Sequence, residues 1–405
     1  MKMTLKNMAR VGLLMLSVSF IHSAAEARDL YVDQANGSDD YDGLTAQTAK
    51  RTIQAAVDIA KSRDTVKVAE GVYEDVNIHN DGVSACVVIS NNLTLVATGA
   101  KEKTHIVGRH ADTATGVGDG AVRCIYVKSD SGKTVRIQGF TIRDGATVSG
   151  NGGGVAFAVY DSGKNIERGW LVDCVVSNCV AVRGGALLYG TAIRCLFSGN
   201  ASGGSDKPYG TVASQSILYN CIVAENVGGD RLFNYPRAIV NCTIAGNNMN
   251  NFCYSSGAHY IYNTIFLENA EKKFHNSNAV LSNCLVSSGI SAFNQTASGM
   301  CATNDSGHCF FAPATGDWRP TAESGAAGLG DASHLASVNL PEESLRYVDY
   351  IGNPIAQSGS ITCGAIQETV ETHGGYLILD GRFAVDGMGV SYANRCRYVH
   401  AANYP

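Results

Sequence analysis

Proline, metal-binding motifs and long apolar runs are all scarce in this chain of 405 residues, and each scarcity narrows what the protein can be. With 7 prolines beside 45 glycines, the composition suits a turn-rich β architecture rather than a disordered chain. There is no Cys-x-x-Cys pair and no histidine cluster at metal spacing, which argues against a zinc site. The net charge of −5, without a basic stripe interleaved with aromatic residues, gives no reason to expect a nucleic-acid partner.

An apolar run near the N-terminus has the features of an export signal. Three basic residues precede the run at residues 11–21, which is too short to span a bilayer comfortably. The Ala-Glu-Ala sequence at 25–27 then offers a cleavage site. We therefore predict that residues 1–27 are a signal peptide, that the protein is secreted or held at the cell surface, and that no transmembrane segment remains after removal of the signal.

One short phrase recurs six times in the middle of the chain. An apolar pair and a polar residue precede a position occupied by Cys174, Cys195, Cys221, Cys242, Thr264 and Cys284. The spacings are 195−174 = 21, 221−195 = 26, 242−221 = 21, 264−242 = 22 and 284−264 = 20. A period in this range is the mark of a solenoid, in which each coil buries its apolar side against its neighbours.

The residues around the repeated position sort into columns, with β-branched residues and turn formers that favour strands over helices. Two residues later the chain carries Val176, Phe197, Val223, Ile244, Phe266 and Val286, which we expect to share the inner side with the cysteines. Five residues later it carries Asn200, Asn226, Asn247 and Asn269, which suit a recurring turn and can form an amide ladder.

The positions directly beside the repeat do not follow simple alternation. The preceding residue is polar in all six copies, and the following one is apolar in Val175, Leu196, Ile222, Ile265 and Leu285. Strict alternation in a strand would place both outside. Either loops cover that side of the solenoid, or a turn breaks the alternation.

Thirteen cysteines in an exported chain would ordinarily indicate disulfides. The five cysteines of the repeat column point the same way, which is poor disulfide geometry, so we predict free, buried thiols there. Cys301 and Cys309 lie outside the coils and are better candidates for a bridge.

The start of the mature chain predicts a cap for the solenoid. Ile53, Ala56, Val57 and Ala60 fall on one side of a short helix, and an open solenoid end needs such a cover.

Asp33, Asp39, Asp40 and Asp42 cluster just before this helix. Carboxylates on a glycine-containing loop can hold calcium, the one cofactor that the sequence suggests. The alternative is a solvated turn, which we favour because the spacing does not match an EF-hand loop.

These patterns together resemble the right-handed parallel β-helix of the pectate-lyase-like superfamily, over roughly residues 29–367. The Gly-Gly-Ala-Leu and Phe-Ser-Gly-Asn steps at 184–187 and 197–200 also resemble polymorphic outer-membrane protein repeats. The opening segment resembles that of secreted bacterial β-helix proteins, including one family of polysaccharide lyases. The resemblance implies an all-β solenoid with a short N-terminal capping helix.

The same resemblance divides the mature chain into three parts. Residues 28–300 would form the capped β-helix, and residues 301–367 resemble the closing segment of secreted bacterial surface proteins. There the family's Asp-Gly-Asn-Pro step reads Ile-Gly-Asn-Pro at 351–354. Residues 368–405 would be a short extension, in which another β segment can start.

Candidate chemistry is sparse along the coils. A β-helix lyase needs a cation site and a basic residue on adjacent coils, and no three carboxylates between residues 170 and 300 share a column. The strongest basic grouping is Arg183, Arg231 and Lys273, with Asp230 beside Arg231. It is either an anion-binding strip for acidic sugars, with Arg231 or Lys273 as a catalytic base, or solvated loop charge.

Three functional hypotheses follow, all with a polysaccharide or a cell-surface glycan as the expected partner. The preferred one is a non-catalytic, adhesin-like protein that binds glycans or surfaces along its side. The alternative is a polysaccharide lyase that cleaves acidic polysaccharide by β-elimination. A third is a structural stalk within a longer surface protein. Fold alone does not decide among them.

Overall fold

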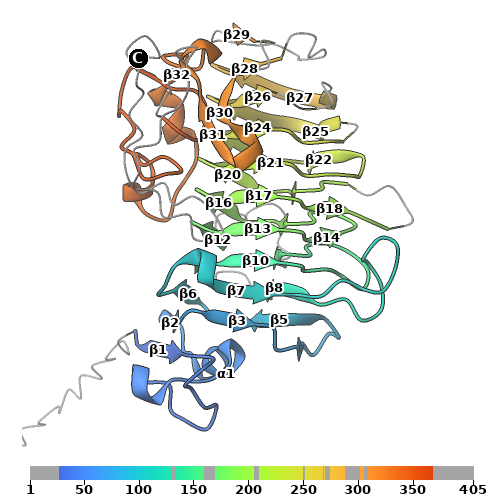
Figure 1. The fold of residues 1–405 in the computed structure, drawn as a ribbon, viewed down its shortest axis with the longest axis vertical. Coiled ribbons are helices and arrows are strands. Elements are labelled where there is room, and N and C mark those ends of the chain that lie inside the picture. The colour runs from blue at the N-terminus through green and yellow to red at the C-terminus, as the bar shows by residue number, and fades with distance from the viewer. Residues whose placement is uncertain are drawn as a thin grey trace, which may run out of the picture.

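The chain winds into a right-handed parallel β-helix, which confirms the predicted fold (Figure 1). The structure is a computed structural model, and it describes residues 27–367 except 129–133, 159–168, 205–208, 250, 268, 270–273, 288–301 and 305–308. The predicted signal peptide (apart from residue 27), Lys273, Cys301 and the extension 368–405 lie outside the described residues. No helix in the described part is long and apolar enough to cross a bilayer.

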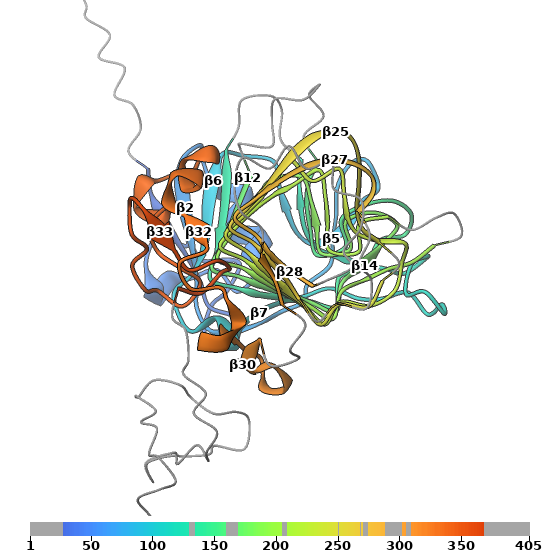
Figure 2. The same cartoon turned by 90° about the horizontal axis from the view of Figure 1, so that it is seen from above.

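Each coil contributes strands to three faces, which Figure 2 shows in cross-section. Face 1 contains β1 (Asp29–Val32), β2 (Asp64–Val68), β6 (Leu93–Ala97), β9 (Val135–Gln138), β12 (Gly169–Val172), β16 (Thr191–Ile193), β20 (Ile217–Tyr219) and β23 (Ala238–Val240). Face 2 contains β5 (Ser84–Ile89), β8 (Arg123–Val127), β11 (Val155–Phe157), β15 (Leu187–Leu188), β19 (Ala213–Ser214) and β22 (Arg231–Asn234). The long strands β25 (Asn251–Tyr262) and β27 (Phe274–Ser282) run across both faces and join them into one sheet.

Face 3 is a separate ten-stranded parallel sheet. It contains β3 (Gly71–Tyr73), β7 (Thr104–Val107), β10 (Thr141–Arg143), β13 (Val175–Ser177), β17 (Leu196–Ser198), β21 (Ile222–Ala224), β24 (Thr243–Ala245), β26 (Ile265–Leu267), β28 (Leu285–Val286) and β29 (Ala302–Thr303). Between faces 3 and 2, the short strands β14 (Val180–Ala181) and β18 (Ala201–Ser202) pair at the corner.

The repeated cysteines form a fully buried column between faces 1 and 3. Successive coils are linked through sulfur, because the backbone N–H of Cys195 donates to Sγ of Cys221, and that of Cys221 donates to Sγ of Cys242, both at 3.4 Å. Cys174, Cys195, Cys221 and Cys242 are free thiols as predicted, and burial raises the pKa of the first three well above its usual value. The predicted Cys301–Cys309 bridge is untested, since Cys301 lies outside the described residues.

The asparagine column forms the predicted ladder inside the coil. The backbone N–H and Nδ2 of Asn200 both donate to Oδ1 of Asn226, and the same pair of bonds links Asn226 to Asn247 and Asn247 to Asn269. Nδ2 of Asn226 also donates to the Phe197 carbonyl of the coil before it. Each buried amide is therefore satisfied by its neighbours, which is the condition for burying polar groups at all.

Next to the repeated position, a turn breaks the strand alternation and another part of the chain also covers the outer side, so both of the alternatives given above apply. The residue before each repeated position has a left-handed backbone, with φ of 50° to 55° in Asp173, Arg194, Asn220, Asn241, Asn263 and Asn283, so a turn breaks the alternation. Short polar residues tolerate this conformation well, which explains the preference for asparagine. The apolar positions that follow, such as Ile222, Ile265 and Leu285, point outward and are covered by the end of the chain.

The segment of residues 309–367, here called the C-terminal segment, folds back over the outer sides of faces 1 and 3 (Figures 1 and 2). It contains β30 (Phe310–Ala312), η4 (Pro313–Thr315), β31 (Asp317–Pro320), η5 (Ala322–Ser324), β32 (Gly330–Asp331), η6 (Ala332–Ser337), η7 (Glu343–Leu345) and β33 (Ser360–Ile361). Three asparagines of the repeated turn bind it through hydrogen bonds from Nδ2 to backbone carbonyls. Asn220 donates to Val348, Asn263 to Asp331 and Asn283 to Leu329.

The predicted capping helix is α1 (Ile53–Ile59), which closes the N-terminal end after the short helix η1 (Ala46–Thr48). Thr52 caps α1 by accepting the N–H of Ala55, and the side chains of Ile53 and Val57 are buried against the first coils. The hairpin strand β4 (Asn77–Ile78) pairs antiparallel with β5, and η2 (Lys101–Lys103) precedes β7.

Candidate functional site

The outer side of face 2, here called the open side, is not covered by the described residues of the C-terminal segment (Figure 2). Register aligns one outward column on it, through Val88, Tyr126, Ala156, Leu188, Ser214, Asn234 and Tyr254. The column is mostly aliphatic in the early coils and becomes polar and aromatic in the later ones.

In these later coils an arginine lies between two tyrosines. The guanidinium carbon of Arg231, at the start of β22, is 4.2 Å from the ring centre of Tyr209 and 4.3 Å from that of Tyr254. Tyr235 packs edge-on against Tyr254, with ring centres 5.4 Å apart. Arg231 is thereby held on both sides, and only 11% of its side chain is exposed. Such a cation–π arrangement fixes an otherwise flexible side chain.

The stack extends by one coil towards the N-terminus and carries one carboxylate. Arg183 forms a parallel bridge with Tyr209, and its guanidinium carbon lies 5.9 Å from that ring. Asp230 places Oδ2 at 2.9 Å from Nε of Arg231 and accepts a hydrogen bond from Nδ2 of Asn251 at 3.1 Å. The structure thus brings together Arg183, Asp230 and Arg231, three of the residues proposed as an anion-binding strip. Two tyrosines alternate with the arginines, so the order along the coils is Arg183, Tyr209, Arg231 and Tyr254.

Of the two tyrosines of the stack, the sequence singled out Tyr254 as a recurring aromatic residue but not Tyr209, because offsets counted forward from the repeated position cross loops of unequal length. Counted back from the following repeated position, the four residues align closely: 195−183 = 12, 221−209 = 12, 242−231 = 11 and 264−254 = 10. The insertion that separates Arg183 from Tyr209 lies before Tyr209, so only the backward count keeps register. This signal was present in the sequence.

The proposed calcium residues are engaged in local turns instead. Asp33 accepts the backbone N–H groups of Ala35 and Asn36, and hydrogen bonding from the Asn36 side chain lowers its pKa. Asp39 accepts the N–H of Thr52, and Asp42 that of Leu44.

Asp40 is exposed, and no group of three or more metal-binding side chains occurs among the described residues.

Comparison with known proteins finds distant structural likenesses. No family model and no curated protein matches the sequence. Similar solved structures include a rhamnogalacturonan lyase, at 12% identity and a TM-score of 0.41 over 64% of this chain and 74% of that one. Pectin methylesterase PemA from Erwinia chrysanthemi has 12% identity and a TM-score of 0.42, over 73% and 99% of the two chains. Pectate lyase Pel9A has 13% identity and a TM-score of 0.39, over 85% and 97%.

These likenesses concern the solenoid and say nothing of chemistry in this chain. The resemblance to polymorphic outer-membrane protein repeats stays a prediction.

Proposed function

We propose that this chain is an exported protein that binds polysaccharide along the open side without cleaving it, as an adhesin-like module. The observation that carries the proposal is the stack of Arg183, Tyr209, Arg231 and Tyr254. It places ordered aromatic rings and guanidinium groups on the outer surface of successive coils. Aromatic rings and arginine are the side chains most enriched at recognition surfaces, because they present a large contact area at low entropic cost.

The spacing of the stack favours a polymer over a small ligand. Arg183 and Arg231 lie two coils apart, which is roughly 10 Å at a strand spacing of about 4.8 Å. A ligand that contacts both must bridge this length, as an extended glycan does. Arg183 is exposed, so its guanidinium is available to carboxylates of an acidic polysaccharide.

The contacts of Arg231 favour binding over a role as catalytic base. The Asp230 carboxylate beside Nε stabilises the charged guanidinium, and both of its planar sides are covered by tyrosine rings. A charged guanidinium donates hydrogen bonds and has no acceptor for a proton. This is the property of a residue that binds an anionic sugar.

The test is binding of the mature chain to polygalacturonate, alginate and chondroitin sulfate by calorimetry. Arg231→Ala should weaken the affinity at least tenfold, and Arg231→Lys should recover part of it, because lysine keeps the charge but not the planar stack. Arg51→Ala, at the exposed N-terminal cap, is the control. Equal affinity of wild type and Arg231→Ala would overturn the proposal, as would binding to none of these polymers. Accumulation of unsaturated product would instead identify a lyase.

A further inference from the structure

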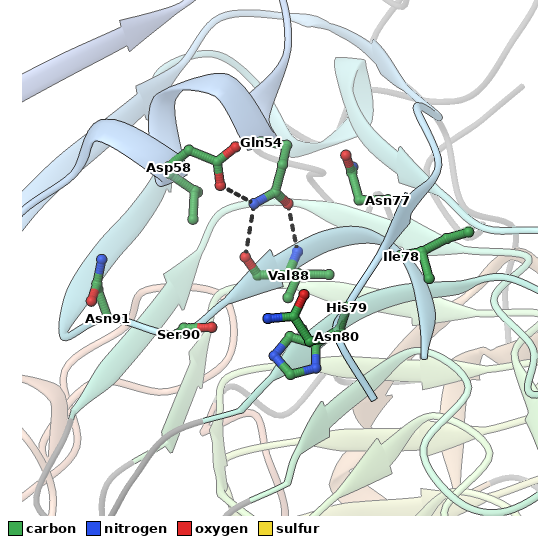
Figure 3. Close-up of a pocket in the computed structure, with 10 residues that line it drawn as sticks. Gln54, Asp58, Asn77, Ile78, His79, Asn80, Val88, Ser90 and Asn91 are labelled. Carbon is green, nitrogen blue, oxygen red and sulfur yellow. Dashed lines mark hydrogen bonds between the residues drawn. The ribbon is translucent and has the colours of Figure 1, made fainter. Parts of the chain in front are cut away.

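A polar cleft of about 340 Å³ lies between the capping helix α1, the β4–β5 hairpin and β5 itself (Figure 3). It lies at the N-terminal end of the solenoid, among coils well before the stack. Its volume is at the lower end of the roughly 300–1,000 Å³ that small-molecule sites occupy. No motif of the sequence points to it, because three separate segments of the chain supply its lining.

One wall of the cleft is rigid. Gln54 on α1 pairs with the backbone of Val88 as a strand would, with Oε1 accepting the Val88 N–H at 2.8 Å and Nε2 donating to the Val88 carbonyl at 3.1 Å. The same Nε2 donates to Oδ1 of Asp58 at 2.7 Å (Figure 3). The helix, the strand and this carboxylate therefore keep their places without a ligand, which lowers the entropic cost of binding.

The opposite wall presents an imidazole that the protein holds in one orientation. Nδ1 of His79 lies 2.7 Å from Oδ1 of Asp81. The other carboxylate oxygen accepts Nζ of Lys128 at 2.7 Å and the hydroxyl of Tyr126 at 3.1 Å. The backbone N–H of Asp81 also donates to Nδ1 of His79 at 3.3 Å, so Asp81 holds the imidazole through both its carboxylate and its backbone. Nε2 is the ring nitrogen left for a ligand, as donor or acceptor according to the tautomer.

The remaining lining combines hydrogen-bonding groups with one apolar side chain. Asn80 is exposed at the rim, where its amide provides both donors and an acceptor. Ile78 is 73% exposed beside it, the largest exposed fraction of any large hydrophobic residue described. An aliphatic surface next to amide, carboxylate and imidazole groups complements a molecule that has an apolar face and a rim of hydroxyl groups.

The charge of the cleft selects among such molecules. Asp58 is the one carboxylate among its lining residues, which include no lysine or arginine. A carboxylate on a ligand would meet Asp58 without a compensating cation. We propose that this cleft binds a neutral sugar residue. It would be a second carbohydrate site, independent of the stack on the open side, and it would prefer neutral sugars where the stack prefers acidic ones.

The experiment uses the mature chain with methyl β-galactoside and galacturonate as matched neutral and acidic probes, measured by saturation-transfer NMR and calorimetry. The galactoside should bind more tightly than galacturonate, and Asp58→Asn should narrow this difference. His79→Ala and Asn80→Ala should each weaken galactoside binding at least tenfold. Ile78→Ser, a change at an exposed position that leaves folding intact, should weaken it several-fold.

The controls separate this site from the stack. Gln47→Ala, exposed on η1 outside the cleft, should bind the galactoside as wild type does. Arg231→Ala should leave galactoside binding unchanged, whereas His79→Ala should leave polygalacturonate binding unchanged. The proposal fails if the wild type does not bind the galactoside, if galacturonate binds equally well, or if the Ile78→Ser and His79→Ala proteins both bind like wild type. Each of these outcomes is independent of whether the stack binds polysaccharide.

Discussion

The covered and open sides of the solenoid share one core, but in the later coils they differ in the residues that point outward. On face 1, Val172 and Val240 are fully buried beneath the C-terminal segment, and on face 3 Ile265 is equally buried. On face 2, outward positions in the later coils hold Asn234 and Tyr254 beside Arg231. The inward residues of all three faces belong to one apolar core. The outward residues therefore differ with their surroundings: they are apolar beneath the described C-terminal segment, and polar and aromatic in the later coils of face 2.

The largest expected effect is the loss of an aromatic anchor from the covered side. Trp318 in β31 is 4% exposed and packs edge-on against Phe310, with ring centres 5.3 Å apart. Trp318→Ala should lower the free energy of unfolding by about 3–5 kcal/mol, because it leaves a cavity under the segment. The matched change on the open side, Tyr235→Ala, should cost below about 1 kcal/mol, since Tyr235 is exposed. Urea denaturation of both variants measures the two changes in the free energy of unfolding. Equal decreases for Trp318→Ala and Tyr235→Ala would contradict the distinction between the two sides.

A smaller effect is expected from the carboxylate of Asp81 at the edge of the open side, whose side chain is 31% exposed. Desolvation opposes ionisation of Asp81, but hydrogen bonds from Lys128, His79, Val83 and Tyr126 outweigh it and hold its pKa well below the usual range. Because solvent screens these contacts, Asp81→Asn should cost about 1 kcal/mol at pH 7.

The pH dependence of this loss has a defined sign. A lowered carboxyl pKa stabilises the fold above the unfolded-state value of about 3.9, and that stabilisation is lost as the pH falls further. The difference between wild type and Asp81→Asn, measured by urea denaturation, should shrink below about pH 4. The exposed Asp119→Asn serves as the control. A difference that stays constant down to pH 2 would show that the charge of Asp81 does not contribute.

The smallest effect is an acid-sensitive contact of the covered side. His334 stacks on Tyr262 with ring centres 4.1 Å apart, and burial lowers its pKa although Asp331 opposes this. The unfolded chain then binds more protons as the pH falls below about 6.5, so this contact should lose up to about 1 kcal/mol between pH 7 and the lowered folded-state value. The protection of residues 330–345 against hydrogen exchange, expressed relative to the intrinsic exchange rate at each pH, should fall with acid in the wild type and not in His334→Gln. An unchanged acid response in His334→Gln would assign the effect to other groups, and His110→Gln is the control.

The solenoid could be predicted because its signals are periodic and local. The cysteine and asparagine columns follow from a register that neighbouring coils share, and Ile53 and Val57 reveal the cap through helical spacing. The stack was only half visible: Arg183 and Arg231 were found, but Tyr209 was hidden by an insertion that shifts the forward offset. The cleft has no period at all, because Gln54, His79 and Val88 come from a helix, a hairpin and a strand.

What the sequence determined by itself is the inside of this protein. Stacked coils repeat every 20 to 26 residues, so burial imposes the same side chain at the same step, and such repetition can be counted. Only the tertiary structure decided the outside. The described C-terminal segment covers faces 1 and 3 but not face 2, and the folding of α1 against β5 creates the cleft. Both depend on contacts between distant segments, whose partners carry no shared spacing to reveal them.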